Sequence, residues 1–298
     1  MISPDHSDTP SVYCVIVNWN GWQDTIACLD ALRVQDYPNL TVVVVDNGSA
    51  NESVAQIRAA HPWATLIETG QNLGFPGGCN AGTRVAYKNG ADFIWLLNND
   101  TVAPPDTARL LVRTALDHPE AGVIGAVLYY MHDAGQVQAW GGGRINLTTA
   151  YTTHFTAPAS FAAPDTYFTG ASMLIPRRVC EAVGLLYEGF FMYCDDSDFC
   201  LRVRQAGYAL VMCEGTAIRH REGASSPKRS PLIDQLATTS TLRLLERHAP
   251  YPGVSMTLYL GLRSFSRLLR GRWGNLAGVW RGTRIYRREK GVPFSQQL

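Results

Sequence analysis

Short apolar runs alternate with amphipathic segments over the first 130 residues of the chain. The runs, rich in β-branched residues, predict buried strands at 12–17, 40–45, 64–68, 92–97 and 122–128. Segments with helical spacing lie between them, at 24–35, 51–60, 79–89 and 105–117. Apolar strands that alternate with helices predict a mostly parallel sheet covered by helices on both faces. A ligand of such a sheet is expected beyond the carboxyl ends of its strands.

The pattern changes after residue 130. Residues 136–156 are rich in Gly and Thr and predict a hairpin. We expect a strand at 167–175, helices at 177–184 and 195–206, and a last strand at 208–213. Residues 221–231 are polar, contain two prolines and are a candidate lid. The spacing beyond them is helical.

Two polar clusters follow predicted strands. Asp46 begins the sequence Asp46-Asn47-Gly48-Ser49 after the strand at 40–45, and Asn98-Asn99-Asp100 follows the strand at 92–97. Taken alone, either cluster is also a good turn or helix cap. Carboxylate and amide oxygens at a strand end suit Mg²⁺ or Mn²⁺, usually with substrate phosphates completing the coordination shell.

Further candidates lie elsewhere in the chain. Asp195-Asp196-Ser197-Asp198 begins a predicted helix directly after an aromatic stretch, and partial burial there would raise the proton affinity of a carboxylate, as suits a general base. One of these residues could instead only cap the helix. His220 follows the last predicted strand, and a lone histidine seldom carries function. The glycine-rich segment 72–80 could bring backbone N–H groups to a phosphate, but it is neither a dinucleotide fingerprint nor a P-loop.

Composition excludes several classes of protein. The formal net charge of +1 gives no reason to expect nucleic acid as a partner. The seven cysteines include no C-x-x-C pair, so we expect no disulfide framework or zinc site, and a reducing cytoplasm fits best. The first ten residues have no signal-peptide pattern, and the chain has no run of 18 apolar residues that would span a membrane.

The motifs become specific when they are taken in order, because together they resemble family 2 of the inverting GT-A glycosyltransferases, especially bacterial rhamnosyltransferase-like enzymes. The resemblance covers roughly residues 12–225 and rests on six stretches: 15–21, 44–49, 72–80, 96–101, 170–175, and 190–202 with His220. It implies a GT-A fold with a mostly parallel, Rossmann-like central sheet and a C-terminal helical extension. It further implies a catalytic domain at 1–230, with a nucleotide-sugar-binding half at 12–128 and an acceptor-binding half at 129–230, before a basic helical segment at 231–298.

The resemblance also assigns expected roles. Asp196 would be the catalytic base, with Asp195 as the alternative, and Gly170 and Ala171 would border the acceptor. Asp100, Asn98 and His220 would hold Mg²⁺ or Mn²⁺ at the diphosphate. The residues expected at the nucleotide sugar are Asn18, Asn20, Asp46, Asn47, Asn72, Gly77, Gly78, Asn80, Asn98 and Asn99.

Two positions depart from the family pattern. The usual metal motif is Asp-x-Asp, and Asn98 stands at its first position, which removes one carboxylate from the metal site. The usual Glu-Asp that ends in the base is Asp195-Asp196, so that either carboxylate could act.

The resemblance implies transfer of a sugar, first of all rhamnose from dTDP-rhamnose, to a hydroxyl of a glycan or lipid-linked acceptor in cell-surface polysaccharide assembly. Two alternative functions stay open. A sugar-nucleotidyltransferase would have a Gly-rich N-terminal loop with Arg and Lys, which residues 18–24 lack. A non-catalytic carbohydrate-binding protein with a decayed site would have no reason to keep Asp46, Asp100, Asp196 and His220 together.

The last part of the chain carries its own signal. Residues 243–298 contain 11 Lys/Arg against two Asp/Glu, whereas residues 1–242 contain 15 against 23. An apolar face at helical spacing lies opposite Arg263, Arg267, Arg270 and Arg281, and it consists of Leu258, Leu262, Phe265, Leu269, Trp273, Leu276 and Trp280. This pattern fits a helix on an anionic membrane, which would make the protein peripheral on the inner face of the cell membrane. It fits equally a helical pair packed on the catalytic domain with solvated arginines.

Overall fold

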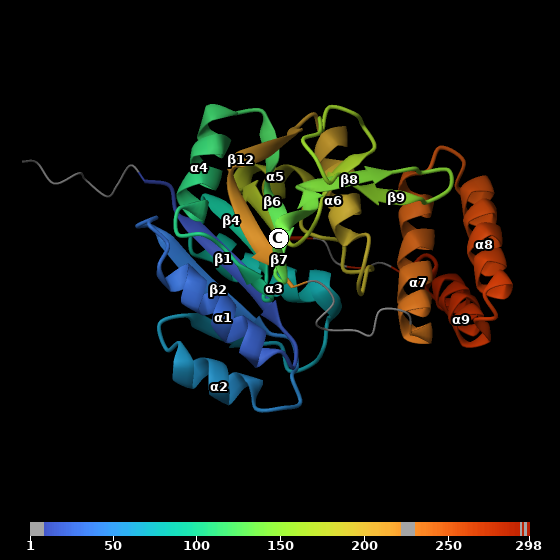
Figure 1. Ribbon diagram of the computed structural model, residues 1–298, viewed down its shortest axis with the longest axis horizontal. Coiled ribbons are helices and arrows are strands. Elements are labelled where there is room, and N and C mark those ends of the chain that lie inside the picture. Colours follow the sequence, from blue (N-terminus) through green and yellow to red (C-terminus); the bar gives the residue numbers. More distant parts are fainter. Residues whose placement is uncertain (1–8, 222–229, 293, 295–296) are drawn as a thin grey trace, which may run out of the picture.

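The computed structural model describes residues 9–221, 230–292, 294 and 297–298 of the 298-residue chain. Its main sheet crosses the left and centre of Figure 1. In spatial order the strands are β3 (Thr65–Glu68), β2 (Leu40–Asp46), β1 (Val12–Asn18), β4 (Phe93–Asn98), β11 (Ser172–Pro176), β6 (Ala121–Tyr130), β12 (Ala209–His220) and β5 (Thr101–Val102). A further strand, β7 (Asp133–Trp140), pairs with the end of β6. The first four strands run parallel, as their apolar composition predicts.

Helices cover both faces of this sheet. The buried residues of α1 (Trp22–Arg33), α2 (Ser53–Ala60) and α4 (Thr107–Asp117) belong to one apolar cluster. Those of α3 (Gly74–Lys88), α5 (Arg177–Val183) and α6 (Asp195–Gln205) belong to a second cluster on the other face. The predicted mixed α/β fold, with a mostly parallel sheet between two helical layers, is confirmed.

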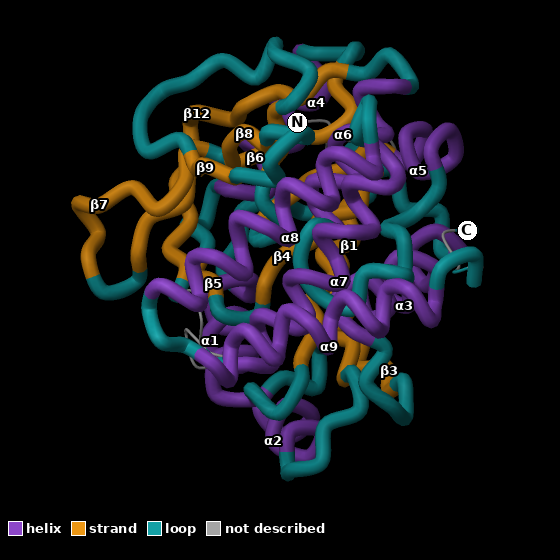
Figure 2. Tube along the Cα trace, turned by 90° about the vertical axis from the view of Figure 1, so that its right-hand side faces the viewer, coloured by secondary structure: helices purple, strands orange, loops and turns teal. Residues whose placement is uncertain are grey.

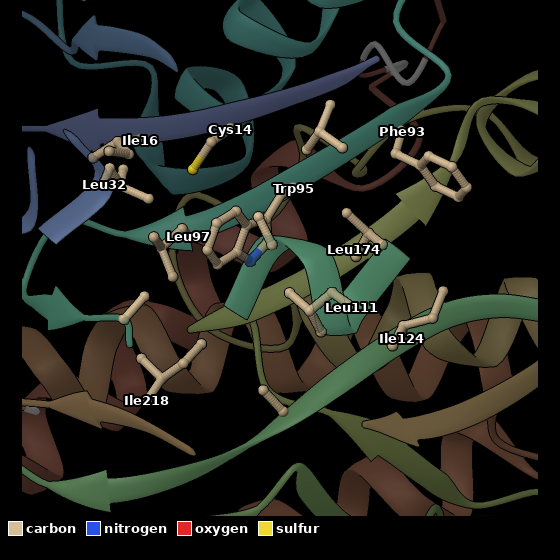
Figure 3. Close-up of a cluster of buried hydrophobic side chains, with 14 of the residues drawn as sticks. Cys14, Ile16, Leu32, Phe93, Trp95, Leu97, Leu111, Ile124, Leu174 and Ile218 are labelled. Carbon is tan, nitrogen blue, oxygen red and sulfur yellow. The ribbon is translucent and has the colours of Figure 1, made fainter. Parts of the chain in front are cut away.

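The core fixes the middle strands of the sheet, which carry the site at their ends. Trp95 of β4 is fully buried among Cys14, Leu97, Leu111 and neighbouring apolar side chains (Figure 3). Its indole N–H donates to the Ser172 hydroxyl of β11 (3.0 Å), which satisfies the one polar atom of the ring. Strands β4 and β11 are therefore joined by this side-chain hydrogen bond as well as by the backbone hydrogen bonds of their antiparallel pairing.

Three segments differ from the sequence expectation. The strand expected at 167–175 is broken at 169–171 into β10 (Thr166–Phe168) and β11, because β10 pairs with a different sheet. The hairpin expected at 136–156 is three strands, β7, β8 (Gly142–Ile145) and β9 (Thr152–His154), of which β8 pairs with both β9 and β10. The last strand continues past residue 213, because β12 resumes its pairing with β6 after an irregularity at Cys213–Ala217.

The C-terminal part is a bundle of three helices: α7 (Pro231–His248), α8 (Pro252–Leu269) and α9 (Trp273–Glu289). It lies at the right of Figure 1, with α7 next to the catalytic part and α8 farthest from it. Helix α7 is joined to the segment before α6, where the Ser240 hydroxyl donates to the Met192 carbonyl (2.7 Å). The bundle begins where the expected domain boundary at 230/231 lies. The central residues of the candidate lid, 222–229, lie outside the described residues.

Candidate active site

The carboxyl ends of β1 and β2 carry a buried polar pair. Asn18 and Asp46 stand opposite each other in the parallel register, and Asn18 Nδ2 donates to Asp46 Oδ2 (2.8 Å). The other carboxylate oxygen of Asp46 accepts from the Ser49 backbone N–H (2.9 Å). Thr25 Oγ1 donates to Asn18 Oδ1 (2.8 Å) and accepts from Asn99 Nδ2 (3.0 Å). The structure therefore brings these residues together and fixes the orientation of the Asp46 carboxylate.

Three further asparagines order the loops around this pair. Asn20 Oδ1 accepts from the Ala50 N–H (2.8 Å), which ties the β1–α1 loop to the β2–α2 loop. Asn47 is buried and donates both to Asn72 Oδ1 (3.2 Å) and to the Gly74 carbonyl (2.9 Å). Direct contact of these asparagines with a nucleotide stays a prediction. Their hydrogen bonds hold together the loops in which such a contact would form.

The glycines of α3 have a packing role in this structure. The helix begins at Gly74, so Gly77 and Gly78 lie in its first turns and not in a turn before it. A Cβ on Gly78 would lie 2.7 Å from Val17 Cγ1, so this glycine lets α3 approach β1 closely. Asn80 faces the segment before α6, since its amide donates to the Leu186 carbonyl (2.7 Å) and accepts from the Leu186 N–H (3.1 Å). Nucleotide contacts by these three residues stay predictions.

The proposed metal ligands come from the end of β4 (Asn98), the β4–β5 turn (Asp100) and the end of β12 (His220). His220, at the end of β12, lies opposite Thr101 of β5, and its Nε2 is 3.1 Å from Asp100 Oδ1. The same nitrogen is 3.3 Å from Asn98 Nδ2. On the other side of the ring, Nδ1 lies 2.8 Å from Gln138 Oε1, an oxygen that can only accept, so Nδ1 carries a proton. Gln138 thus presents Nε2 to the centre of the cluster.

Gln138 is a site residue that the sequence motifs do not mark. It lies on β7, where it is buried, and no sequence pattern indicates it. Partners of this kind fix the tautomer and the ring direction of a ligating histidine.

Gln138→Leu, which removes the acceptor and keeps the side-chain volume, is therefore expected to weaken metal activation about 10- to 100-fold. The concentration of Mn²⁺ that gives half-maximal activity measures this. An unchanged value would show that His220 needs no such partner, and Gln205→Leu, at an exposed position on α6, is the matched control.

The second half of the site is the carboxylate cluster at the start of α6. Tyr193 and Cys194 have positive φ angles (72° and 65°), so the chain turns sharply before the helix begins at Asp195. Asp196 Oδ2 accepts from the Gly170 N–H (3.0 Å), and Oδ1 accepts from the Ser197 N–H (2.7 Å). The break between β10 and β11 thus supplies a backbone donor to this carboxylate.

The two adjacent carboxyls have different electrostatic environments. Burial, and next the charge of Asp196, raise the pKa of Asp195 well above its usual range. Burial also raises the pKa of Asp196, but the hydrogen bonds from Gly170 and Ser197 favour its ionised form. Asp196 is the more exposed of the two. Of this pair, Asp196 is therefore the carboxyl better suited to take a proton from a bound acceptor.

The third carboxyl of the cluster is structural. Asp198 is fully buried and binds Arg202 (2.8 Å), Arg247 (2.7 Å) and His248 (2.8 Å). Burial alone would raise its pKa, but the hydrogen bond from His248 and the charges of the arginines hold it at about 2. Arg247 and His248 belong to α7, so this carboxylate anchors the C-terminal bundle to α6.

The same architecture occurs in solved glycosyltransferase structures. The mannosyltransferase PcManGT from Pyrobaculum calidifontis, in complex with GDP-Man and Mn²⁺, superposes with a TM-score of 0.59 over 98% of this chain and 78% of its own, at 19% identity. GalNAc-T7 with UDP, GalNAc and Mn²⁺ gives a TM-score of 0.64 over 98% of this chain and 59% of its own, at 12% identity. At these identities the likeness is one of fold, and the fold is GT-A.

Curated proteins with similar sequences match part of this chain, and they differ in how much of their own length the match covers. The uncharacterized protein y4gI of Sinorhizobium fredii is 31% identical over 211 residues, which are 63% of this chain but only 22% of that protein. The N-acetylglucosaminyl-diphospho-decaprenol L-rhamnosyltransferase of Mycobacterium tuberculosis is 25% identical over 236 residues, which are 70% of this chain and 76% of that enzyme. The low-salt glycan biosynthesis hexosyltransferase Agl10 of Haloferax volcanii is 25% identical over 60% of this chain and 58% of its own.

The family is settled by a match along most of the sequence. The sequence model described as "Glycosyltransferase like family 2" matches residues 10–235, a range that includes both halves of the candidate site. The chain belongs to glycosyltransferase family 2.

Proposed function

We propose that the protein is an inverting glycosyltransferase in which Asp196 is the catalytic base. One observation carries this proposal: the short break before β11 links the two halves of the site. Gly170 donates to the Asp196 carboxylate, and the Ala171 carbonyl accepts from the Asn98 N–H (3.0 Å). The consecutive residues Gly170 and Ala171 thus connect the proposed base to the proposed diphosphate site. Sugar transfer between two bound substrates requires such a fixed arrangement.

The reaction needs few groups from the protein. Asp196 takes the proton of an acceptor hydroxyl while that oxygen forms a bond to the anomeric carbon of the donor sugar. The bond from this carbon to the nucleoside diphosphate breaks on the opposite face, so the anomeric centre is inverted. The buried surroundings of Asp195 and Asp196 limit the access of water, which would otherwise hydrolyse the donor.

The residues around Asp100 fit a divalent cation, Mg²⁺ or Mn²⁺. Asn98 Oδ1 is buried without a hydrogen-bond partner. The Nδ2 atom of the same side chain is 3.3 Å from His220 Nε2, and this nitrogen is 3.1 Å from Asp100 Oδ1. Within the described residues no group of three or more His, Cys, Asp or Glu could hold a metal by itself, so donor phosphate oxygens would have to complete the shell. When bound, the cation would act as a Lewis acid toward the leaving diphosphate.

A metal requirement has a direct test. Asp100→Ala is expected to weaken both donor binding and turnover, because it removes the one carboxylate of this cluster, and EDTA is expected to reproduce the effect on the wild type. The measurements are donor affinity by calorimetry and the rate of sugar transfer. Full activity in excess EDTA would instead assign the neutralisation of the diphosphate to a cationic side chain such as Arg221, which adjoins Asp100 through a backbone hydrogen bond (3.0 Å).

One of the relatives supports a proposal for the donor and the acceptor. The M. tuberculosis enzyme is by name a rhamnosyltransferase that acts on a lipid diphosphate, and this supports dTDP-rhamnose as donor and a lipid-linked saccharide as acceptor. Cell-surface polysaccharide assembly is the corresponding role. All seven cysteines are free thiols, which supports the cytoplasm as the compartment, at the inner face of the cell membrane.

A thermal-shift panel separates the alternatives. A nucleoside diphosphate that binds only the folded state raises its melting temperature by mass action, so dTDP with Mn²⁺ or Mg²⁺ is expected to give the largest shift. Single-turnover transfer from the matching nucleotide sugar then tests catalysis. Nucleotide binding without transfer would favour a non-catalytic carbohydrate-binding protein, and pyrophosphate release from a nucleoside triphosphate with a sugar 1-phosphate would favour a sugar-nucleotidyltransferase.

A further inference from the structure

Helices α8 and α9 expose an unusual number of large apolar side chains. Phe265, Leu269 and Trp273 have exposed fractions of 60%, 72% and 68%. We call the following set the outer face: Val254, Leu258, Leu262, Phe265, Leu269, Trp273 and Trp280. Figure 2, which views the molecule from the right-hand side of Figure 1, shows α8 and α9 in front of the catalytic part. Contiguous apolar surface of this kind marks an interaction site.

Ion pairs on the inner side hold α8 in this orientation. Arg263 and Arg267 both bind the Asp234 carboxylate of α7 (2.7 and 2.6 Å), and Asn275 of α9 donates to the same group (2.7 Å). The sequence expectation of solvated arginines opposite the apolar face is therefore wrong for Arg263 and Arg267. The polar side of α8 is directed into the bundle, and its apolar side is directed outward.

The charge around the outer face is strongly positive. Residues 251–298 contain nine Lys/Arg and one acidic residue, Glu289. Glu289 is itself bound by Arg243. Exposed arginines that form no ion pair with the described residues lie at Arg270, Arg281, Arg284, Arg287 and Arg288. An apolar face bordered by such arginines is complementary to a bilayer that contains anionic lipid.

The outer face adjoins the acceptor half of the enzyme. A groove of about 560 Å³ runs between the β8–β9 turn and α8, and Tyr151, Leu262 and Arg263 are among its lining residues. Leu262 belongs both to this groove and to the outer face. The β8–β9 hairpin pairs with β10, which leads directly into Gly170 beside Asp196. A surface that seats α8 would thus lie next to the β8–β9 hairpin of the acceptor half.

We propose that the outer face of α8 and α9 docks on an anionic lipid bilayer, with Phe265, Leu269 and Trp273 in the headgroup region. No helix in the described part of the chain is long and apolar enough to cross a membrane, and the contact is an interfacial one. Tryptophan favours that interface because its ring is apolar and its N–H is polar. The proposal rests on the proposed function only for the idea that the acceptor is embedded in the same bilayer.

The first experiment measures co-sedimentation of the full-length protein with vesicles of phosphatidylglycerol and phosphatidylcholine. Binding is expected at low salt, and added salt and pure phosphatidylcholine vesicles are expected to weaken it. Phe265→Ser with Leu269→Ser should lower the partition coefficient at least about tenfold. The matched control is Val34→Ser with Leu116→Ser, two positions that are both 59% exposed, on the catalytic part.

A second set of variants tests the role of charge in the same co-sedimentation experiment. It combines Arg284→Gln, Arg287→Gln and Arg288→Gln. This triple variant should also bind at least about tenfold more weakly, because each arginine near an anionic surface adds to the attraction. Its control is Arg33→Gln, Arg58→Gln and Arg113→Gln, which removes three exposed charges from α1, α2 and α4. Equal losses in both triple variants would assign the attraction to overall charge and overturn the docking surface.

The second experiment locates the contact through tryptophan fluorescence. Lipids with a quencher near the headgroup should quench the wild type, and the quenching should fall for Trp273→Phe with Trp280→Phe but persist for Trp63→Phe, another exposed tryptophan. Absence of vesicle binding together with a dimer mass in solution would assign the outer face to a second copy of this chain. Sugar transfer to a water-soluble acceptor should be unaffected by the outer-face variants, so a failure of this proposal is distinguishable from a failure of the proposed function.

Discussion

Asp196→Asn is expected to lower the rate of sugar transfer at least about a hundredfold, the low end of the effect of losing a general base. The substitution keeps the size of the side chain and can keep an acceptor oxygen for the Gly170 N–H, which now binds the carboxylate at 3.0 Å. The amide cannot take the proton, and it has one acceptor oxygen where the carboxylate has two, for the Gly170 and Ser197 N–H groups. Donor affinity should change little, since the base is expected to contact the acceptor. Single-turnover transfer and donor titration measure the two effects separately.

Asp195→Asn is the informative comparison for this prediction. Burial and the neighbouring Asp196 raise the pKa of Asp195 well above its usual range, which favours its protonated form, and Asn resembles a protonated Asp. Its loss of rate should therefore be much smaller. If Asp196→Asn keeps near wild-type turnover and Asp195→Asn does not, the assignment of the base is reversed.

The pH dependence of kcat/KM is an independent test of Asp196 as the catalytic base. Burial raises the pKa of Asp196, so the base is protonated, and inactive, at a pH where an ordinary Asp with a pKa of 3.8 is ionised. As the pH is lowered, kcat/KM should fall along an acid limb centred above that value. The residual activity of Asp196→Asn should lack this limb. An identical limb in the variant would assign the titration to another group.

Much of this site was predictable because its residues follow strands. Periodicity located the carboxyl ends of β1, β2 and β4, and parallel register then brings Asn18 opposite Asp46. The same reasoning fails for Gln138, which reaches His220 from β7 through an irregular antiparallel pairing with β6. No local pattern encodes a register shift between distant strands, so this partner is visible only in the structure.

The C-terminal bundle shows a second limit of the sequence pattern. Helical spacing correctly separated an apolar from a basic side, but it could not say which side meets the protein. Asp234 decides this, because it binds Arg263 and Arg267 and so orients the basic side of α8 inward. Asp234 is 29 residues from Arg263 and 33 from Arg267 along the chain, and neither their pairing nor the break between α8 and α9 follows from periodicity.

One buried carboxylate makes several of the contacts that attach this bundle to the catalytic part. Asp198 of α6 is fully buried, and it is the common partner of Arg202 on its own helix and of Arg247 and His248 on α7. Loss of its charge removes one ion-pair partner each from Arg202, Arg247 and His248 at a fully buried position. Breaking a buried pair in this way is far more costly than breaking an exposed one.

Asp198→Asn is therefore expected to lower the free energy of unfolding by about 3–5 kcal/mol, measured by urea denaturation. The matched control, Asp117→Asn, breaks an exposed pair with Arg113 (3.7 Å) and should cost less than about 1 kcal/mol. If Asp198→Asn does not fold, Arg202→Gln, which removes one partner, should give a smaller loss of the same sign. The folded pKa of Asp198, about 2, lies below the ordinary 3.8, so its contribution is complete above about pH 4 and disappears as the pH falls through about 2. The wild type should accordingly lose stability over this range more steeply than Asp198→Asn, and equal slopes would show that the carboxylate does not hold α7 to α6.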